Sequence, residues 1–362
     1  MSEFDGMRVL LVNVDCRWNL ALRRMYAYYE NNGAQVEMRD LGFGFYPHNK
    51  YEVINGRGYD LIAISNIFET NADRVSVYGC DNVQRGGVGS MSDSKLPPEI
   101  EATPPKYFDY EDTAHGFITR GCIRKCYFCK VPQHEGQLRA YRSVQEVVGS
   151  FKKAIFMDNN ILAWDGANDA MDWLIDNNIR CCFNQGLDLR LVNNDNLKRL
   201  ARLNYMGEYV FAFDDVRLMG FIDEVIPLVK KHIPKPWKVK MFVYVNAETM
   251  HPEDTVKRIE WLKEHECLPY VMRDKNCYGS DDELFYTDLA SWCNQPGIFK
   301  KMDFHEFLKR RNPKNKRRQA ESWAKFTNEQ PNICQSCWEP TLDLFGDGYC
   351  PDCYEEELND NT

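Results

Sequence analysis

The sequence contains no stretch of about 18 apolar residues, the length that a membrane-spanning helix requires. Its first residues lead almost directly into an apolar run and contain neither a basic start nor a small-residue cleavage site, so they do not resemble a secretory signal. These two absences predict a cytoplasmic protein that does not enter a membrane.

The chain also lacks an overall positive charge, with 45 Lys and Arg against 54 Asp and Glu and a formal net charge of −9. A basic surface over the whole molecule, the usual mark of a nucleic-acid-binding protein, is therefore not predicted. The charge is uneven, however. Seven of the ten residues 309–318 are Lys or Arg, whereas the last eleven residues are acidic in character.

What the chain does contain is the composition of a globular protein and many cysteines. Hydrophobic residues make up 44% and charged residues 27% of its 362 residues, a length that allows two domains or one large domain with appendages. Its 14 cysteines include two tight clusters, at 122–129 and 334–353. In a cytosolic protein such clusters indicate metal ligands or redox groups rather than disulfides.

Residues 1–78 predict a small doubly wound α/β domain. Residues 8–14, RVLLVNV, form a continuous apolar run that is typical of a parallel strand buried on both faces. A segment with apolar residues at helical spacing follows it and ends at Gly33, and two more strand-like runs come after. Residues 79–112 are rich in Gly, Pro and Ser, which favours a linker or a loop lying over a site.

From residue 113 to 305 the sequence alternates between strand-like and helical segments, and six such units predict a partial (β/α)6 barrel. Residues 306–330 are expected to be a basic linker, and 331–362 a separate small unit. Polar residues that follow the strands of a barrel gather at one end of it. One common mouth is therefore predicted to contain Cys122, Asp158, Asn159, Gln185, Asp188, Arg190, Asp214, Asn246 and Arg273.

Cys122, Cys126 and Cys129 have a C-x3-C-x2-C spacing on the loop after a predicted strand. Three thiolates on so short a loop can wrap one corner of an iron–sulfur cubane and leave one iron without a protein ligand. Catalytic metal sites retain an exchangeable position of this kind. The alternatives are a structural zinc site completed by His134 and incidentally buried cysteines, and the position ahead of a barrel-like series argues against both.

This spacing, placed before a six-unit α/β series, resembles the signature of the radical S-adenosylmethionine superfamily. The resemblance implies a [4Fe–4S] cluster whose open iron is chelated by the amino and carboxylate groups of S-adenosylmethionine. It also implies an electron donor such as flavodoxin or ferredoxin, and cleavage of the sulfonium bond to a 5′-deoxyadenosyl radical that abstracts hydrogen from a substrate. The cofactor supplies this chemistry, while the protein orients the reactants and excludes water.

Four segments resemble, more narrowly, radical S-adenosylmethionine proteins of phages and mobile elements. This narrower likeness covers roughly residues 7–300 and indicates fold and cofactor rather than substrate. The segments are residues 14–37, 111–122, 183–191 and 209–215.

The superfamily resemblance suggests which residues contact S-adenosylmethionine. Phe128, directly before the last cluster ligand, matches the aromatic position that lies near the adenine. Asp158 and Asn159 end the second strand of the barrel series, where members usually hold the amino end of S-adenosylmethionine. The Gly-Gly-Glu motif often found there is Met-Asp-Asn-Asn in this chain, so the correspondence is loose.

Polar residues at the next two strand ends complete the predicted cofactor site. Gln185, Asp188 and Arg190 end the third strand, and Asp214 ends the fourth. A guanidinium suits a carboxylate through two parallel hydrogen bonds, and an Asp suits ribose hydroxyls. The alternative for each of these residues is a salt bridge at the end of the barrel.

The N-terminal domain resembles, in pattern and position, the cobalamin-binding domain of one large subgroup. The usual Asp-x-His-x-x-Gly motif does not occur in residues 1–114, whose only histidine is His48. We therefore favour a domain that has kept this shape without cobalamin over one that binds cobalamin without a histidine ligand. Methylthiotransferases carry three further cluster cysteines in this region. Residues 1–114 of this chain contain only Cys16 and Cys80, so a methylthiotransferase is not predicted.

The tail contains two C-x2-C pairs, formed by Cys334, Cys337, Cys350 and Cys353. Four thiolates suit the closed tetrahedral shell of structural zinc, so a zinc-ribbon-like tail is predicted. A second iron–sulfur cluster is the alternative. So short a segment has no core of its own without a metal.

Together these features predict a radical enzyme, and we favour a base of DNA or RNA as its substrate. A basic segment adjoins the ribbon, and ribbons often contact nucleic acid. A base in a duplex would have to be extruded to reach the barrel mouth. The alternatives are modification of a small metabolite, a nucleotide or a protein side chain, with the ribbon structural only, and a non-enzymatic metal-binding adaptor.

Overall fold

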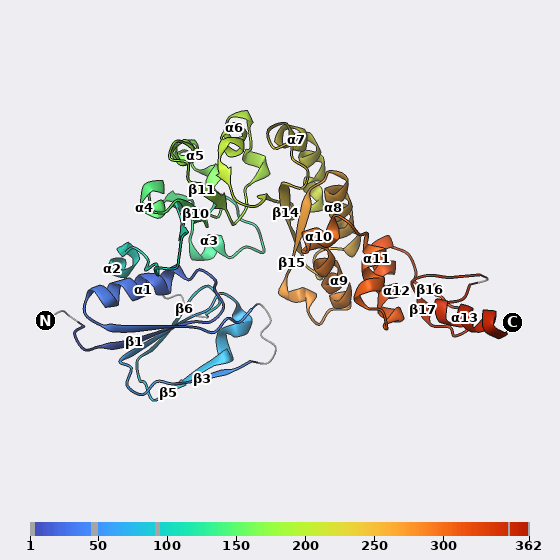
Figure 1. Ribbon diagram of the computed structural model, residues 1–362, viewed down its shortest axis with the longest axis horizontal. Coiled ribbons are helices and arrows are strands. Elements are labelled where there is room, and N and C mark those ends of the chain that lie inside the picture. The colour runs from blue at the N-terminus through green and yellow to red at the C-terminus, as the bar shows by residue number, and fades with distance from the viewer. Residues whose placement is uncertain (1–3, 45–49, 91–94, 347, 361–362) are drawn as a thin grey trace. The chain divides into compact units, whose positions relative to one another are not determined.

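The computed structural model describes residues 4–44, 50–90, 95–346 and 348–360 (Figure 1). The chain divides into two compact units, Met1–Ile155 and Phe156–Thr362, and the boundary lies within strand β10 (Lys153–Phe156). Both units are mixed α/β structures with parallel strands, as the sequence predicted. Within the described residues, no helix has the length and apolar character needed to cross a membrane.

The first unit begins with a four-stranded parallel sheet in the order β2-β1-β4-β6. Strand β1 is buried from Val9 onward because both faces of the sheet are covered. Val9 and Leu11 belong to one apolar cluster, and Leu10 and Val12 to another. The strands are β1 (Arg8–Asn13), β2 (Gln35–Asp40), β4 (Leu61–Ser65) and β6 (Val83–Gly86).

Helix α1 (Leu20–Asn31) connects β1 to β2 and supplies Leu22 and Met25 to the core cluster of Val9 and Leu11. The predicted β-α-β segment is therefore present. Part of the segment 79–112, which composition suggested to be a linker, forms β6 and the short helix α2 (Pro98–Ala102). Strands β3 (Glu52–Asn55) and β5 (Val75–Tyr78) form a separate parallel pair.

The remainder of the first unit holds the loop of the first cysteine cluster. Strand β8 (Thr119–Arg120) pairs antiparallel with β9 (Arg139–Ala140), so the two ends of the intervening loop lie side by side. The other elements are β7 (Ala114–Gly116), α3 (Val131–His134) and α4 (Val144–Val148).

The second unit repeats a strand, a short turn and a helix. Strands β13, β14 and β15 form a parallel sheet, and β11 pairs with β12 in parallel. A parallel bridge between Leu187 and Phe211 connects the end of β11 to β13. The strands are β11 (Arg180–Phe183), β12 (Asn204–Tyr205), β13 (Tyr209–Ala212), β14 (Val239–Val245) and β15 (Leu268–Arg273).

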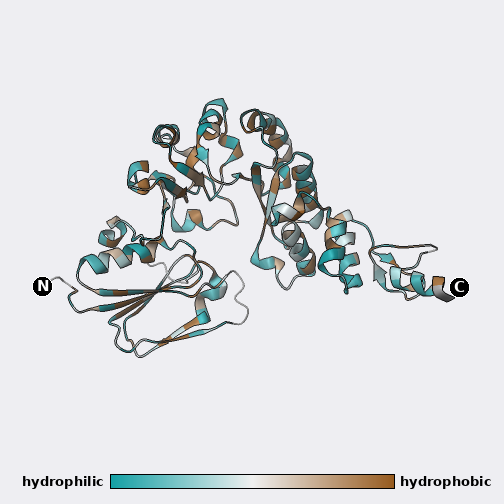
Figure 2. Cartoon of the chain, in the orientation of Figure 1, coloured by the Kyte–Doolittle hydropathy of each residue, from teal (hydrophilic) through white to brown (hydrophobic). Residues whose placement is uncertain are grey.

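Amphipathic helices follow these strands, and hydrophilic and hydrophobic residues alternate along them (Figure 2). No closed barrel is formed by the described residues, and the partial barrel remains a prediction. The helices are α5 (Ala167–Asp176), α6 (Asn194–Arg202), α7 (Met219–His232), α8 (Pro252–Glu264) and α9 (Glu283–Cys293).

The basic segment lies in and between two helices. Helices α11 (Phe304–Arg311) and α12 (Lys316–Thr327) follow the short α10 (Pro296–Phe299). Asp288 on α9 is fully buried. Its carboxylate accepts hydrogen bonds from Arg311, Arg318 and Ser322. Since a buried carboxylate requires partners of this kind, the basic side chains lock both helices onto α9.

The chain ends with a small hairpin and a helix. Strands β16 (Asn332–Ile333) and β17 (Pro340–Thr341) pair antiparallel, and α13 (Pro351–Asp360) follows. The four tail cysteines lie in and around these elements.

Candidate functional site

The loop of the first cysteine cluster is clamped at its base. Gly121 N donates to Glu135 Oε2 at 2.9 Å, and Arg120 forms an ion pair with the same carboxylate at 3.1 Å. Gly121 has φ +80°, and a Cβ at this position would lie 2.2 Å from the carbonyl oxygen of Gln137. Only glycine fits so close an approach, so this residue is required for the loop to leave β8.

The three cysteines of this loop are half-buried, and all fourteen cysteines lie in described parts of the chain with no disulfide among them. Arg124 N donates to Cys122 Sγ at 3.3 Å, and Cys129 N donates to the Cys126 carbonyl at 3.0 Å. Backbone N–H groups that face a cysteine sulfur stabilise its thiolate and tune the potential of a bound cluster. The loop thus carries three half-buried cysteines, and its base is held by Glu135.

Two aromatic residues precede the last cysteine. Phe128 is half-buried and packs edge-to-face on the exposed Tyr127, with ring centroids 5.3 Å apart. The group of converging metal ligands found among the described residues is that of the four tail cysteines, and it includes neither His134 nor a cysteine of this loop. The three cysteines and Phe128 belong to the first unit, whereas the strand-end residues from Asp158 to Arg273 belong to the second. Their gathering at one mouth therefore stays a prediction.

The second unit brings together three of the predicted strand-end residues. Asp188 is buried, and its carboxylate accepts from Arg190 Nε at 2.7 Å and Nη2 at 3.2 Å. Asn160, which sequence reasoning missed, is buried beside it and donates to Asp188 Oδ2 at 3.4 Å. Asp214 is close enough for the charges of Asp188 and Arg190 to act on it. The salt bridge considered as an alternative role thus joins Asp188 to Arg190.

Asp214 is the most strongly perturbed carboxyl group of this cluster. Burial raises the pKa of Asp214 to about 6, against the opposing charge of Arg258 and a hydrogen bond from the Tyr244 backbone. Its Oδ1 is buried and has no hydrogen-bond partner among the described residues. A carboxyl group with an unused acceptor at a strand end is a good candidate to bind a ligand hydroxyl or amine.

Arg258 is a second group that sequence reasoning missed. It lies on α8 and is buried, and its Nη1 donates to the Phe213 carbonyl at 2.9 Å and the Tyr244 carbonyl at 3.0 Å. Burial lowers its pKa to about 10. The sequence signal was available, because Arg258 sits beside Ile259 in the apolar stripe of α8, where a surface arginine is not expected.

The other predicted residues lie at strand ends with different surroundings. Asp158 is buried, Asn159 half-buried and Gln185 exposed. The amide of Asn246 donates to Tyr244 OH at 3.1 Å, which makes it part of a local network. Arg273 Nη1 donates to Thr287 on α9 at 2.6 Å.

The tail cysteines form a metal-binding group. The sulfurs of Cys334, Cys337, Cys350 and Cys353 all lie within 4.8 Å of one another. Cys350 N donates to Cys334 Sγ at 3.2 Å. Burial opposes ionisation of Cys334, but backbone N–H groups outweigh it and lower the pKa of this thiol to about 6. Four sulfurs converging in this way can hold a metal ion such as zinc.

No protein-family model matches this chain, and no curated protein matches its sequence. The site is therefore interpreted from its own residues. His48, the only histidine of residues 1–114, lies outside the described residues.

The tail site predicts a metal that depends on Cys350. The protein should contain about one tightly bound zinc ion in the tail, and Cys350→Ser should lose it because tetrahedral closure needs all four thiolates. Elemental analysis by inductively coupled plasma mass spectrometry measures this. Cys80→Ser, a half-buried cysteine outside both clusters, is the control and should keep its zinc. Iron with matching sulfide in the tail would instead support a second iron–sulfur cluster.

The raised pKa of Asp214 predicts a pH-dependent stability. The folded protein holds this proton more tightly than the unfolded chain, so the carboxyl lowers stability as pH rises from about 4 to above 6. Asp214→Asn should therefore raise the free energy of unfolding by about 1–3 kcal/mol at pH 7.5 and leave it nearly unchanged at pH 4. Urea unfolding at both pH values measures the difference.

The neighbouring Asp215 provides the matched control, because its hydrogen bond with Arg217 lowers its pKa. Asp215→Asn should not stabilise the protein at pH 7.5. Equal effects of Asp214→Asn at the two pH values would contradict the assigned environment.

Proposed function

We propose that this protein is a radical S-adenosylmethionine enzyme in which Cys122, Cys126 and Cys129 hold a [4Fe–4S] cluster. The observation that carries the proposal is the C-x3-C-x2-C spacing on a single loop whose ends are held by the β8–β9 pair and Glu135. When bound, the cluster and S-adenosylmethionine supply a 5′-deoxyadenosyl radical for hydrogen abstraction.

The residues present fit this group. The loop carries three half-buried cysteines, and the backbone N–H of Arg124 donates to the sulfur of Cys122. Three ligands leave a cubane one iron with an open position, whereas a structural metal site needs a fourth ligand. Three cysteine ligands therefore suit a cluster that binds a further molecule at its open iron.

Residues of the chain orient the reactants in this proposal. Phe128, half-buried beside the last ligand, provides an apolar surface for an adenine ring. In the second unit the unused acceptor of Asp214 suits a ribose hydroxyl or an amino group. Asp188 holds Arg190 by two hydrogen bonds, which orients the guanidinium. Asp158, Asn159 and Gln185 remain further candidates for contacts to the cofactor.

We propose a base of DNA or RNA as the substrate, with the basic segment 309–318 and the tail as the contact surface. Five of its seven basic side chains form ion pairs within the protein, which leaves Arg310 and Lys314 without an acidic partner among the described residues. The contact to phosphate in this proposal therefore rests on these two side chains. The internal pairing favours a second candidate, a radical enzyme for a small metabolite, a nucleotide or a protein side chain, in which the tail is structural only.

The radical chemistry predicts that Cys126→Ala abolishes cleavage of S-adenosylmethionine. After anaerobic reconstitution with iron and sulfide, the wild-type chain should hold about four iron atoms in this site and, with dithionite, release 5′-deoxyadenosine. Liquid chromatography with mass spectrometry detects that product. Cys80→Ala, in the same unit but outside the loop, is the control and should cleave normally. Unchanged cleavage by Cys126→Ala would refute the assignment.

A nucleic-acid substrate predicts salt-dependent binding through Arg310 and Lys314. Fluorescence anisotropy with labelled single-stranded DNA and with tRNA should show affinity that falls as salt rises. The double variant Arg310→Gln/Lys314→Gln should reduce the log–log slope by roughly 1.5, since each phosphate contact contributes about 0.7–0.9.

Arg317→Gln is the matched control, because Arg317 is already paired with Glu321. It should leave the slope nearly unchanged. No binding at 50 mM salt by the wild-type protein would favour the small-molecule or protein alternative and leave the cleavage experiment unaffected.

A further inference from the structure

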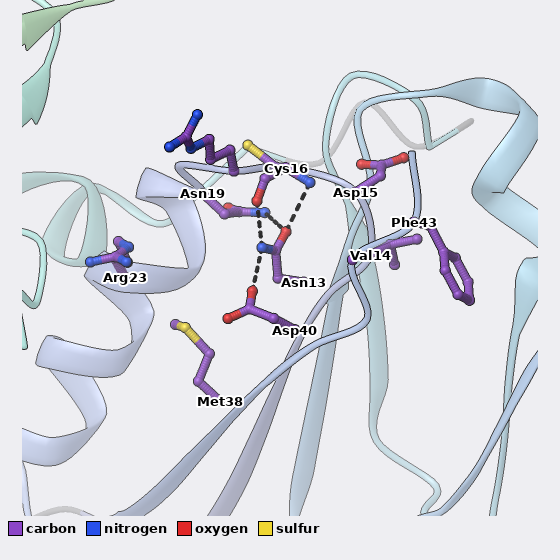
Figure 3. Close-up of a pocket in the computed structure, with 11 residues that line it drawn as sticks. Asn13, Val14, Asp15, Cys16, Asn19, Arg23, Met38, Asp40 and Phe43 are labelled. Atoms are coloured by element: carbon purple, nitrogen blue, oxygen red, sulfur yellow. Dashed lines mark hydrogen bonds between the residues drawn. The ribbon is translucent and has the colours of Figure 1, made fainter. Parts of the chain in front are cut away.

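A cavity of about 340 Å³ lies in the first unit at the carboxyl ends of β1 and β2 (Figure 3). Its lining comes from the loop between β1 and α1, from the end of β2 and from the residues that follow. Cavities that hold small ligands begin at about 300 Å³, and ligands of open parallel sheets bind at this edge. The radical chemistry proposed above uses none of these residues.

The floor of the cavity is a fixed network of polar side chains. Asn13 and Asn19 are both 7% exposed, and Asn19 Nδ2 donates to Asn13 Oδ1 at 3.2 Å. Asn13 Nδ2 in turn donates to Asp40 Oδ1 and to the Cys16 carbonyl, both at 2.5 Å. In Figure 3 the bond from Asn13 to Asp40 connects the end of β1 to the end of β2. The network ties one oxygen of the exposed Asp40 carboxylate to the end of β1.

Asp40 is therefore a preorganised acceptor. Its Oδ1 accepts from Asn13, and an ionised carboxylate has further lone pairs to accept a donor from outside. An acidic residue at the end of the second strand of a β-α-β unit is the group that accepts from ribose hydroxyls in nucleotide-binding folds. Met38 lies beside Asn13 and Asp40 in Figure 3 and offers an apolar surface for a base.

The lining of the cavity also contains a cation, Arg17. Arg17 stacks over Trp18, with its guanidinium carbon 4.8 Å from the ring centroid, and has no acidic partner among the described residues. Helix α1 begins three residues later and has no acidic residue in its first turn. The first turn of the helix therefore adds no negative charge to this part of the cavity, whose carboxylates are Asp15 and Asp40. Arg23 is different, because Glu111 pairs with it at 2.7 and 2.8 Å.

We propose that this cavity binds a ribonucleoside monophosphate, with Asp40 accepting from the ribose hydroxyls and Arg17 facing the phosphate. The chain has no Gly-rich loop here, and the Asn19 side chain already accepts from Leu22 N at the start of α1. One backbone N–H of this helix end is therefore already used, and in this proposal a side-chain cation provides the contact to a single phosphate.

Isothermal titration calorimetry of the full-length chain with AMP, GMP, CMP and UMP tests this inference. At least one of them should bind, and its 2′-deoxy counterpart should bind about tenfold more weakly, because Asp40 then loses a donor. Asp40→Asn and Arg17→Gln should each weaken binding about tenfold or more, and Arg17→Gln should remove the preference for the monophosphate over the nucleoside.

Asp60→Asn is the matched control, since Asp60 accepts from Arg8 N at the opposite edge of the same sheet. It should bind nucleotide like the wild type. Circular dichroism confirms that each variant is folded. The same titration in a Cys126→Ala background separates this site from the cluster, because binding should persist there.

Two results would overturn the inference. One is no binding of any of the four nucleotides at 1 mM. The other is binding that neither Asp40→Asn nor Arg17→Gln weakens, which would place the nucleotide elsewhere in the chain. Neither result bears on cleavage of S-adenosylmethionine, so failure of this proposal and failure of the radical mechanism are distinguishable.

Discussion

Parallel pairing of the strands is the constraint on which the rest of this structure depends. In a parallel sheet all strands end at the same edge, and the loops that follow them are brought together without any further interaction. The first unit uses this edge for the cavity above β1 and β2, and the second uses it for Asp188, Arg190 and Asp214.

Short turns capped by aspartate recur at the strand ends of the second unit. Asp188, Asp215 and Asp274 each accept from a backbone N–H two residues later, at the start of a single 3₁₀ turn. Such a turn redirects the chain from strand to helix while it satisfies a backbone donor. The same residue type therefore serves as a cap in one place and as an ion-pair partner in another, and only its surroundings distinguish the two roles.

Most basic side chains of the segment 309–318 form ion pairs within the protein. The basic segment 309–318 suggested a surface for phosphate, yet Arg311 and Arg318 form ion pairs with the buried Asp288 on α9. A carboxyl group at 0% exposure needs hydrogen-bond donors, and helices α11 and α12 provide them. Two members of the segment remain for an external partner, and the proposed contact to nucleic acid is correspondingly small.

The sequence by itself determined the positions of both cysteine clusters and the β-α-β pattern of residues 8–40, because these depend on spacing along the chain. It could not reveal that Arg258 is buried or that Asp288 forms ion pairs with two arginines. It also could not reveal the hydrogen bond between Asn13 and Asp40, which are 27 residues apart. These depend on which elements pack together, and spacing along the chain does not specify that. Tertiary structure alone decided which polar residues pair with one another inside the protein and which keep an acceptor or a charge for a ligand.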